Sequence, residues 1–286
     1  MTRKDAINVC SAFLCLMAIT MLWTILWKKR DDIDWKKRYM DTWSNSNIRQ
    51  DENMLIAQRN HLAKLLNQKQ QIIGRMKCEE LNRTKVAREE TTDEGGWCPI
   101  ASKTKHLGFD KSLAAGLAEF FQGKNIASFG DGPGRFKSAI LETGQVKSYD
   151  AYDGAPFCEI TSGGLVQFLD LSLPQFGLPV YDWILCLEVA EHVPKAYEEV
   201  LVSNIVRHAR EGVILSWARP GQQGYSHINN QSPEYVISCM DRVGFELHTK
   251  FTDLIRSRTT NKNLQRNINV FVRKEKQSVD ELSYYA

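Results

Sequence analysis

The sequence of 286 residues has few of the residues that build specialised architectures. It contains only 8 prolines and 18 glycines, which excludes collagen-like and low-complexity chains. Its seven cysteines are an odd number and include no C-x-x-C pair, so neither a disulfide-dense scaffold nor a paired-cysteine zinc site is indicated. With 43% hydrophobic and 25% charged residues, the composition is that of a globular protein, and the length fits one domain with an additional segment.

Neither positive nor negative charge dominates the chain, since the net charge is only +3. The charged residues are nevertheless distributed unevenly. Residues 1–90 contain 17 Lys or Arg against 11 Asp or Glu, a balance of +6, which leaves −3 for residues 91–286. Nucleic-acid-binding domains usually carry a basic surface. The acidic balance of the C-terminal part therefore argues against nucleic acid as its main partner.

One long apolar run lies near the N-terminus. Residues 7–27 contain no charged side chain over 21 residues, and a helix of that length spans about 30 Å, the thickness of the hydrocarbon core of a bilayer. Trp23 and Trp27 lie near its end, where indole rings favour the membrane interface. We expect a single-pass transmembrane helix over 7–27 after a short tail, residues 1–6, with the lipid bilayer as its partner. The alternatives are a buried core helix and a cleaved signal peptide, which usually has a shorter apolar core and a small-residue cleavage site.

Two features of the sequence disagree about which side of the membrane the rest of the chain faces. Six basic residues follow the apolar run and two precede it, so the positive-inside rule slightly favours the cytosolic face. A short tail, an anchor and a polar stem are also the layout of many Golgi-lumen enzymes. The sequons at Asn82 and Asn230 would be used only in the lumen. The Golgi or endoplasmic-reticulum lumen is therefore the alternative.

A polar stretch poor in glycine and proline, residues 28–94, predicts a helical stem or linker. Its apolar residues recur at heptad-like spacing, at Leu55, Leu62, Leu65, Ile72 and Met76. The stripe indicates either a coiled coil that makes a homodimer or a solvated single helix, and both interpretations stay open. Asp93 to Gly96 interrupts the pattern, so we expect a domain boundary near residue 94.

Strand-like and helix-like stretches alternate beyond the stem. The expected strands are 125–129, 146–152, 165–169, 181–187 and 212–217, and the expected helices are 136–142, 196–209 and 233–243. This alternation is typical of a parallel sheet with helices on both faces. Two more strands, 245–251 and 268–273, are expected to form a closing antiparallel hairpin. The predicted fold class is α/β, a Rossmann-like, seven-stranded, mostly parallel sheet over residues 95–275, followed by a tail, 276–286.

Three alternating glycines, Gly130, Gly132 and Gly134, follow the first expected strand and precede a helix. Glycines let the backbone pass close under a ligand, and the start of a helix offers free N–H groups. A tight strand-to-helix connection would use glycines as well. The spacing also differs from the dinucleotide fingerprint G-x-G-x-x-G.

With this motif the chain resembles the class I S-adenosylmethionine-dependent methyltransferases over about residues 97–275. The motif of that family reads acidic-x-Gly-x-Gly-x-Gly, and Ser128 stands at its acidic position. The resemblance implies S-adenosylmethionine as the cofactor, with the glycine loop along its methionine part. It also implies a methyltransferase-like domain that transfers a methyl group.

The same resemblance assigns the ends of the next two strands to cofactor binding. The family uses one acidic residue after the second strand to accept both ribose hydroxyls, and Asp153 is the first candidate with Asp150 the second. Asp170 matches the position that reaches the adenine amino group, and Leu171 would lie close to the ring. Asp170 could instead cap the next turn.

The fourth strand is followed by Glu188, Glu191 and His192. Open α/β folds bind ligands at the carboxyl ends of their strands. The family motif at this position borders the methyl-transfer cleft, so Glu188 is expected beside the cofactor. Glu191 or His192 is best placed to deprotonate an acceptor. A structural role for His192, capping a helix, is the alternative.

A loop rich in glycine, histidine and asparagine, residues 216–231, is expected to face the substrate, with Arg219, His227 and Asn229 as candidates. No metal site is expected, because two or three well-spaced ligands are missing. Two other functions stay open. One is a catalytically silent, membrane-tethered methyltransferase-like module, and the other is a nicotinamide-dependent oxidoreductase, whose glycine spacing the chain lacks. The acceptor, whether a small molecule or membrane-borne, is not specified by the sequence.

Overall fold

The computed structural model describes residues 46–84, 91–98 and 109–275. The expected membrane span, 7–27, and both expected tails lie outside these residues. None of the helices in the described part of the chain is both long and apolar enough to cross a membrane. The chain divides into two compact units at Ile56/Ala57, and the second unit contains the domain.

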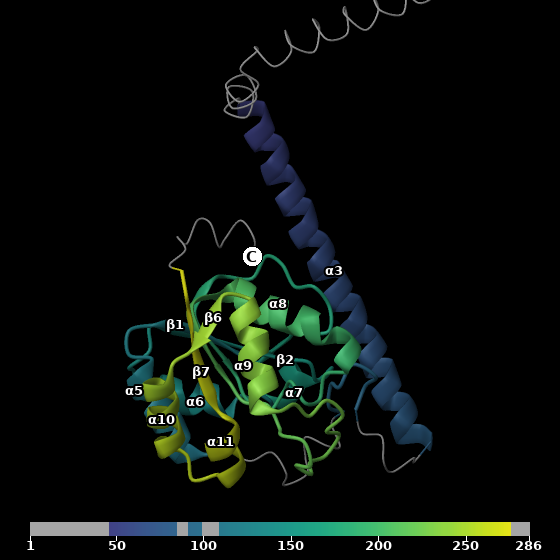
Figure 1. The fold of residues 1–286 in the computed structure, drawn as a ribbon. Coiled ribbons are helices and arrows are strands. Elements are labelled where there is room, and N and C mark those ends of the chain that lie inside the picture. Colours follow the sequence, from purple (N-terminus) through teal and green to yellow (C-terminus); the bar gives the residue numbers. More distant parts are fainter. Residues whose placement is uncertain (1–45, 85–90, 99–108, 276–286) are drawn as a thin grey trace, which may run out of the picture. The chain divides into compact units, whose positions relative to one another are not determined.

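A sheet of seven strands forms the centre of the second unit, and Figure 1 shows it between helices. Its strands are β1 (Asn125–Phe129), β2 (Ser148–Asp153), β3 (Gln167–Phe168), β4 (Tyr181–Cys186), β5 (Ala209–Leu215), β6 (Phe245–Leu247) and β7 (Asn269–Arg273). They are arranged in the order β3-β2-β1-β4-β5-β7-β6. The first five strands are parallel, and β7 runs antiparallel to both of its neighbours. The predicted mostly parallel sheet of seven strands is therefore confirmed.

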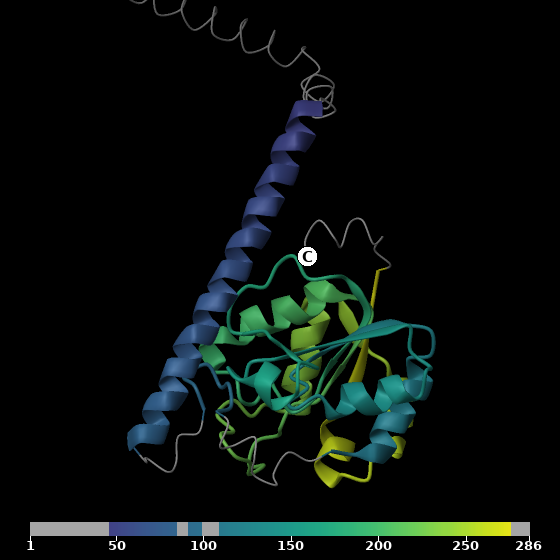
Figure 2. The same ribbon diagram turned by 180° about the vertical axis from the view of Figure 1, so that it is seen from behind.

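Helices cover both faces of the sheet (Figures 1 and 2). They are α5 (Lys111–Phe120), α6 (Arg135–Glu142), α7 (Cys158–Thr161), a 3-10 turn (Lys195–Tyr197), α8 (Glu198–His208), α9 (Pro233–Arg242), α10 (Thr249–Arg258) and α11 (Lys262–Asn267). Alternate residues of a strand face opposite sides, so Phe129 packs with α8 and α9 in one core. Ile126 packs with α5, α6 and α10 in the other. The predicted central strands and helices are present, with their ends shifted by a few residues.

The end of the domain differs from the predicted hairpin. β6 and β7 do pair antiparallel, but α10 and α11 lie between them in the sequence. Phe245, Leu247 and Phe251 alternate as in a strand, yet the strand ends at Leu247. The His248 side chain accepts a hydrogen bond from the Phe251 amide and caps α10. Beyond this cap the buried residues, which include Ile255, follow helical spacing. The alternation over residues 245–251 was therefore too short to distinguish a strand from a helix. Helix α5, which precedes β1, was not predicted.

The stem helix α3 (Ser46–Thr84) protects the open edge of the sheet. The Asn67 amide group binds the outer side of β3, because its Nδ2 donates to the Phe168 carbonyl at 3.0 Å and its Oδ1 accepts from the Asp170 amide at 2.9 Å. Edge strands otherwise present unpaired backbone groups to other chains. The compact unit therefore begins at Ala57, well before the boundary predicted near residue 94.

The predicted heptad stripe lies on the exposed side of α3. Leu62 and Met76 are each 63% exposed, and Ile72 is 50% exposed. The polar residues Asn67 and Gln71, by contrast, contact the domain. Homodimer formation through the stripe stays a prediction.

A disulfide between Cys78 and Cys98 joins the end of α3 to the short segment 91–98. No cysteine spacing in the sequence predicts this pair. Segment 91–98 is packed tightly, since a Cβ on Gly95 would collide with the His192 carbonyl and a Cβ on Gly96 with the Gly154 carbonyl. The disulfide therefore fixes this segment against two loops at the carboxyl end of the sheet.

Candidate functional site

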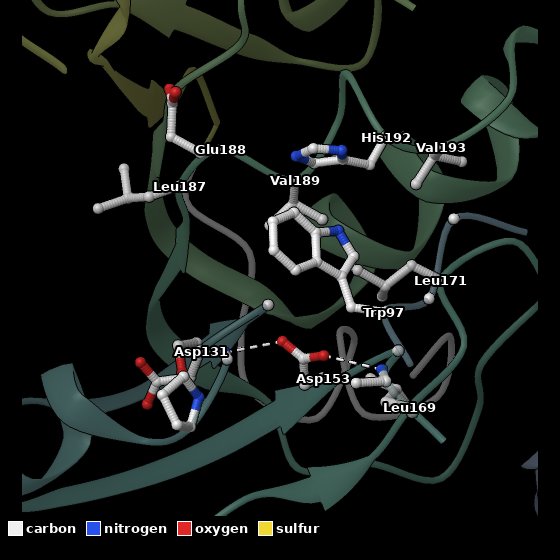
Figure 3. A pocket seen from close by; sticks show the side chains of 18 of the residues that line it. Trp97, Asp131, Asp153, Leu169, Leu171, Leu187, Glu188, Val189, His192 and Val193 are labelled. Carbon is white, nitrogen blue, oxygen red and sulfur yellow. Dashed lines mark hydrogen bonds between the residues drawn. The ribbon is translucent and has the colours of Figure 1, made fainter. Parts of the chain in front are cut away.

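A cavity of about 570 Å³ lies at the carboxyl ends of β1, β2 and β4. Its walls come from the glycine loop after β1, the segments after β2, β3 and β4, segment 91–98 and the loop before α9. Figure 3 shows Asp153, Trp97 and His192 around this cavity. The structure thus brings together most of the positions that the sequence selected.

The glycine loop crosses the end of β2. Gly130, Gly132 and Gly134 have φ values of 94°, 58° and 82°, which residues with a Cβ rarely adopt. A Cβ on Gly130 would collide with the Val189 side chain, so this glycine permits the close approach of the segment after β4. A Cβ on Gly132 would meet no atom within 4 Å. Since Gly132 lines the cavity, the space above it is available to a ligand.

Asp153, at the end of β2, faces the cavity, and Asp150 does not. Asp153 accepts a hydrogen bond from the Gly132 amide at 2.7 Å and another from the Ala155 amide at 2.8 Å, the two bonds drawn in Figure 3. Burial raises the pKa of Asp153 despite these two donors. Asp150 is outside the cavity lining and accepts a hydrogen bond from the Tyr181 hydroxyl at 2.8 Å. The geometry thus favours Asp153 over Asp150 as the acidic residue that was predicted to bind the ribose.

A second acidic residue of the site, Asp131, was missed by the sequence analysis. It lies between two of the loop glycines, lines the cavity and is 7% exposed. Its Oδ2 accepts a hydrogen bond from the Lys137 amide at 3.2 Å, and burial raises the pKa of Asp131 to about 7. Ser128, at the family's acidic position, is buried in the same wall. The loop thus still contains a carboxylate, and its place inside the glycine motif was a readable signal.

Asp170 and Leu171 line the cavity on the side of β3. Asp170 Oδ1 accepts hydrogen bonds from the amide and the hydroxyl of Ser172 at 2.8 and 2.7 Å, so Asp170 also caps the turn. Burial raises the pKa of Asp170. Both interpretations of this residue are therefore compatible with its position.

Glu188 lines the cavity directly after β4 and has a left-handed backbone, with φ 54°. Its amide donates to the Ser216 hydroxyl at 2.7 Å, and that hydroxyl donates to Glu188 Oε1 at 2.8 Å. Left-handed backbone at a non-glycine residue is unfavourable and is concentrated at functional sites. The strain therefore supports the predicted position of Glu188 in the site.

Glu191, His192 and His227 form a cluster whose ligand atoms lie within 4.8 Å of one another. Glu191 is completely buried, while both histidines line the cavity. Burial raises the pKa of Glu191 to about 8, and the charge of Glu188 adds to this effect. Burial and the neighbouring His227 lower the pKa of His192 to about 4. At neutral pH, His192 is therefore the uncharged form that accepts a proton or binds a metal. This grouping was not foreseen, since the sequence analysis expected no metal site.

The other two candidates of the loop 216–231, Arg219 and Asn229, do not line the cavity. Asn229 donates to Glu198 at 3.1 Å, and its carbonyl accepts from the Trp217 indole at 2.6 Å. Arg219 donates to the Arg266 carbonyl. Both residues hold the loop in place, which differs from the substrate-facing role expected for them.

Trp97 and Tyr225 are further aromatic residues of the site that the sequence analysis did not select. The Trp97 ring lies edge-on to His192, with ring centroids 5.6 Å apart, and 5.4 Å from Tyr225. Gly74 of α3 lines the cavity as well. Gly74 lies before the predicted boundary, Trp97 directly after it, and Tyr225 in the loop 216–231, so no local pattern placed the three together.

The sequence matches no family model and no curated protein. Among solved structures, it is similar to a magnesium protoporphyrin IX methyltransferase from Synechocystis PCC 6803 with bound SAH, at 16% identity and a TM-score of 0.44, covering 57% of this chain and 83% of that one. It is also similar to a SAM-bound amino pentose methyltransferase from Micromonospora echinaspora, at 13% identity and a TM-score of 0.46, covering 61% of this chain and 96% of that one. Likenesses of this size carry no conclusion about what the chain binds.

Proposed function

We propose that the chain binds S-adenosylmethionine in this cavity and transfers its methyl group to an acceptor. One observation carries this proposal. The amide of Gly132 binds the carboxylate of Asp153, so a glycine loop and an acidic strand end meet at one wall, with open space above the loop. Bound S-adenosylmethionine would supply an electrophilic methyl group on a positively charged sulfur.

The lining residues fit the parts of such a cofactor. Two backbone donors bind the Asp153 carboxylate, and its remaining lone pairs can accept ribose hydroxyls. Asp170 and Leu171 offer an acceptor and an apolar surface to an adenine ring. The glycine loop, with Asp131 in its wall, leaves room for the charged methionine part.

The opposite end of the cavity is suited to an acceptor. Methyl transfer requires alignment of the reacting atoms in a site that excludes water. Trp97 and Tyr225 enclose this end beside His192. Because His192 is uncharged at neutral pH, one of its ring nitrogens presents a free lone pair at this end of the cavity.

Calorimetry of the full-length protein tests the proposal. We expect heat of binding with S-adenosylmethionine and with S-adenosylhomocysteine, and none with NADH. Asp153→Ala should weaken binding about tenfold or more, because charge-assisted hydrogen bonds contribute about 1.5–3 kcal/mol each. Asp150→Ala, the matched control, removes a carboxylate outside the cavity and should leave the affinity nearly unchanged. The reverse order would move the ribose role to Asp150.

An unmodified protein that binds neither adenosyl compound would contradict the proposal and favour the silent module, and binding of NADH would favour the oxidoreductase.

We also propose that residues 7–27 anchor the protein in a membrane, with the domain in an oxidising lumen. The Cys78–Cys98 disulfide supports the lumen, because structural disulfides persist in the secretory compartments and are rare in the cytosol. The basic residues after the apolar run favour the cytosolic face only slightly. We therefore take the Golgi or endoplasmic-reticulum lumen as the proposed location.

A lumenal domain is expected to carry a single N-linked glycan, on Asn82. Asn82 is exposed near the end of α3. The side-chain nitrogen of Asn230, in contrast, donates to the carbonyls of Arg219 and Gln222, both at 2.9 Å. Treatment with a peptide N-glycosidase should shift the gel mobility of the cellular protein. Asn82→Gln should abolish the shift, and Asn230→Gln should not. A protein that lacks glycan and keeps both Cys78 and Cys98 as thiols would place the domain in the cytosol.

A further inference from the structure

We propose that Glu191, His192 and His227 bind one divalent ion of a first-row transition metal, such as Mn²⁺ or Zn²⁺, at the acceptor end of the cavity. The three side chains come from the segment after β4 and from the loop before α9, so the site joins two parts of the chain that are distant in sequence. Nothing in the proposed methyl transfer by itself calls for this cluster.

The unpartnered carboxylate of Glu191 is the first observation. Glu191 is 0% exposed, and neither of its carboxylate oxygens accepts a hydrogen bond of regular geometry, although the backbone amides of Glu191 and Ala218 lie close enough to lower its pKa. Buried carboxylates in proteins are normally paired, hydrogen-bonded or coordinated to a metal. The nearby charge of Glu188 makes an unpaired carboxylate here less favourable still. A bound cation would satisfy both oxygens of Glu191 and offset the charge of Glu188, which opposes ionisation of Glu191.

The geometry of the cluster is the second observation. His227 Nε2 lies 3.9 Å from Glu191 Oε1, and all three ligand atoms lie within 4.8 Å of one another. Metal–nitrogen and metal–oxygen bonds of about 2.0–2.2 Å place neighbouring ligand atoms about 3–4 Å apart. Side-chain shifts of about 1 Å would therefore bring the three atoms around one ion.

The surrounding backbone orients His192 as a ligand. His192 Nδ1 lies 3.2 Å from the Ser226 carbonyl oxygen. A carbonyl oxygen only accepts, so Nδ1 carries the proton and Nε2 keeps the lone pair that a metal requires. A second hydrogen bond of this kind commonly orients histidine ligands. Ser226 has a left-handed φ of 53°, which is unfavourable for serine, and it directly precedes His227.

Glu191 itself holds the loop that carries the third ligand. Its carbonyl accepts hydrogen bonds from the amides of Ile228 and Asn229 at 2.9 and 3.0 Å. The backbone of one ligand thus positions His227, which precedes Ile228. The loop contributes a ligand, and its other polar residues stabilise it, which explains its unusual content of asparagine, histidine and glycine.

The donor set indicates the class of metal and its use. Two imidazoles with one carboxylate suit transition metals such as Mn²⁺ or Zn²⁺, whereas Mg²⁺ and Ca²⁺ favour sites built from oxygen alone. His192 and His227 line the cavity, so the remaining coordination positions would open toward it. There the ion would bind an oxygen of the acceptor, a role that rests on the proposed function, whereas binding of the ion does not.

Metal titration of the full-length protein tests the site. After dialysis against EDTA, calorimetry with manganese(II) and zinc(II) salts, in the absence of S-adenosylmethionine, should show one ion per chain for at least one metal. Glu191→Gln and His227→Ala should each weaken its binding about a hundredfold or more. His61→Ala, which removes an exposed imidazole of α3, is the matched control and should leave the affinity unchanged.

Thermal unfolding distinguishes a lost ligand from a lost fold. Without metal, Glu191→Gln should unfold at no lower temperature than the unmodified protein, because the substitution removes only a buried acid. With saturating metal, the unmodified protein should gain stability and Glu191→Gln should gain none. Absence of metal binding by the unmodified protein, or unchanged affinity in both variants, would overturn the site. Binding of S-adenosylmethionine is measured on the same sample, so a failure of either proposal is seen separately.

Discussion

Gly132→Val is expected to abolish binding of S-adenosylmethionine, with a loss of affinity of about a hundredfold or more, while the domain stays folded. A Cβ at this position meets no protein atom within 4 Å, and Gly132 lines the cavity beside Asp153. The valine methyl groups would therefore occupy space meant for the ligand and would not clash with the protein. Calorimetry with S-adenosylmethionine measures the loss directly.

Gly144→Val is the matched control for this substitution. Gly144 also has a positive φ, 67°, and a Cβ there would again meet no atom within 4 Å. It follows α6 and is outside the cavity lining. Both variants pay a similar backbone penalty of about 1–2 kcal/mol, so their unfolding temperatures should fall alike while only Gly132→Val loses binding. Equal affinities in the two variants would remove the glycine loop from the proposed cofactor site.

Replacing both Cys78 and Cys98 by alanine is expected to lower the free energy of unfolding by about 3 kcal/mol, the effect of a disulfide that closes a loop of this length. Binding of S-adenosylmethionine should weaken as well. The disulfide fixes segment 91–98, whose Gly96 packs against Gly154, next to Asp153 in the cavity wall. Denaturant unfolding and calorimetry on the same protein measure the two effects.

A reductant provides the control for the disulfide. It should lower the stability of the unmodified protein to that of the double variant and should leave the double variant unchanged. The three free cysteines of the described chain, Cys158, Cys186 and Cys239, are buried and present in both proteins, so they cancel in this comparison. If affinity for S-adenosylmethionine is the same with and without the disulfide, segment 91–98 does not close the cofactor site.

The central sheet and one wall of the cavity could be predicted because their signals are local. Strand β1, the glycine loop and Asp153 are separated by short stretches of sequence, and the carboxyl ends of parallel strands necessarily share one edge. Asp153 was preferred to Asp150 because it stands directly before Gly154 in the turn. In the structure, Asp153 is the last residue of β2.

The rest of the site could not be predicted because it depends on contacts between distant segments. The disulfide joins residues on the two sides of the interruption at Asp93 to Gly96, which from sequence alone indicates a boundary. His227 reaches Glu191 only because two backbone hydrogen bonds fold its loop back onto the strand end. No periodicity or spacing along the chain encodes these pairings.

The bonds that Asn67 makes with the rim of β3 determine how this protein can be shortened for laboratory work. A recombinant fragment starting at Gly95 would remove Asn67 together with Cys78. The outermost strand would then be open to pairing between molecules, and Cys98 would carry a free thiol able to cross-link them. A recombinant version should therefore start before Ala57, so that helix α3 from Ala57 on and the sheet edge that Asn67 binds are produced together.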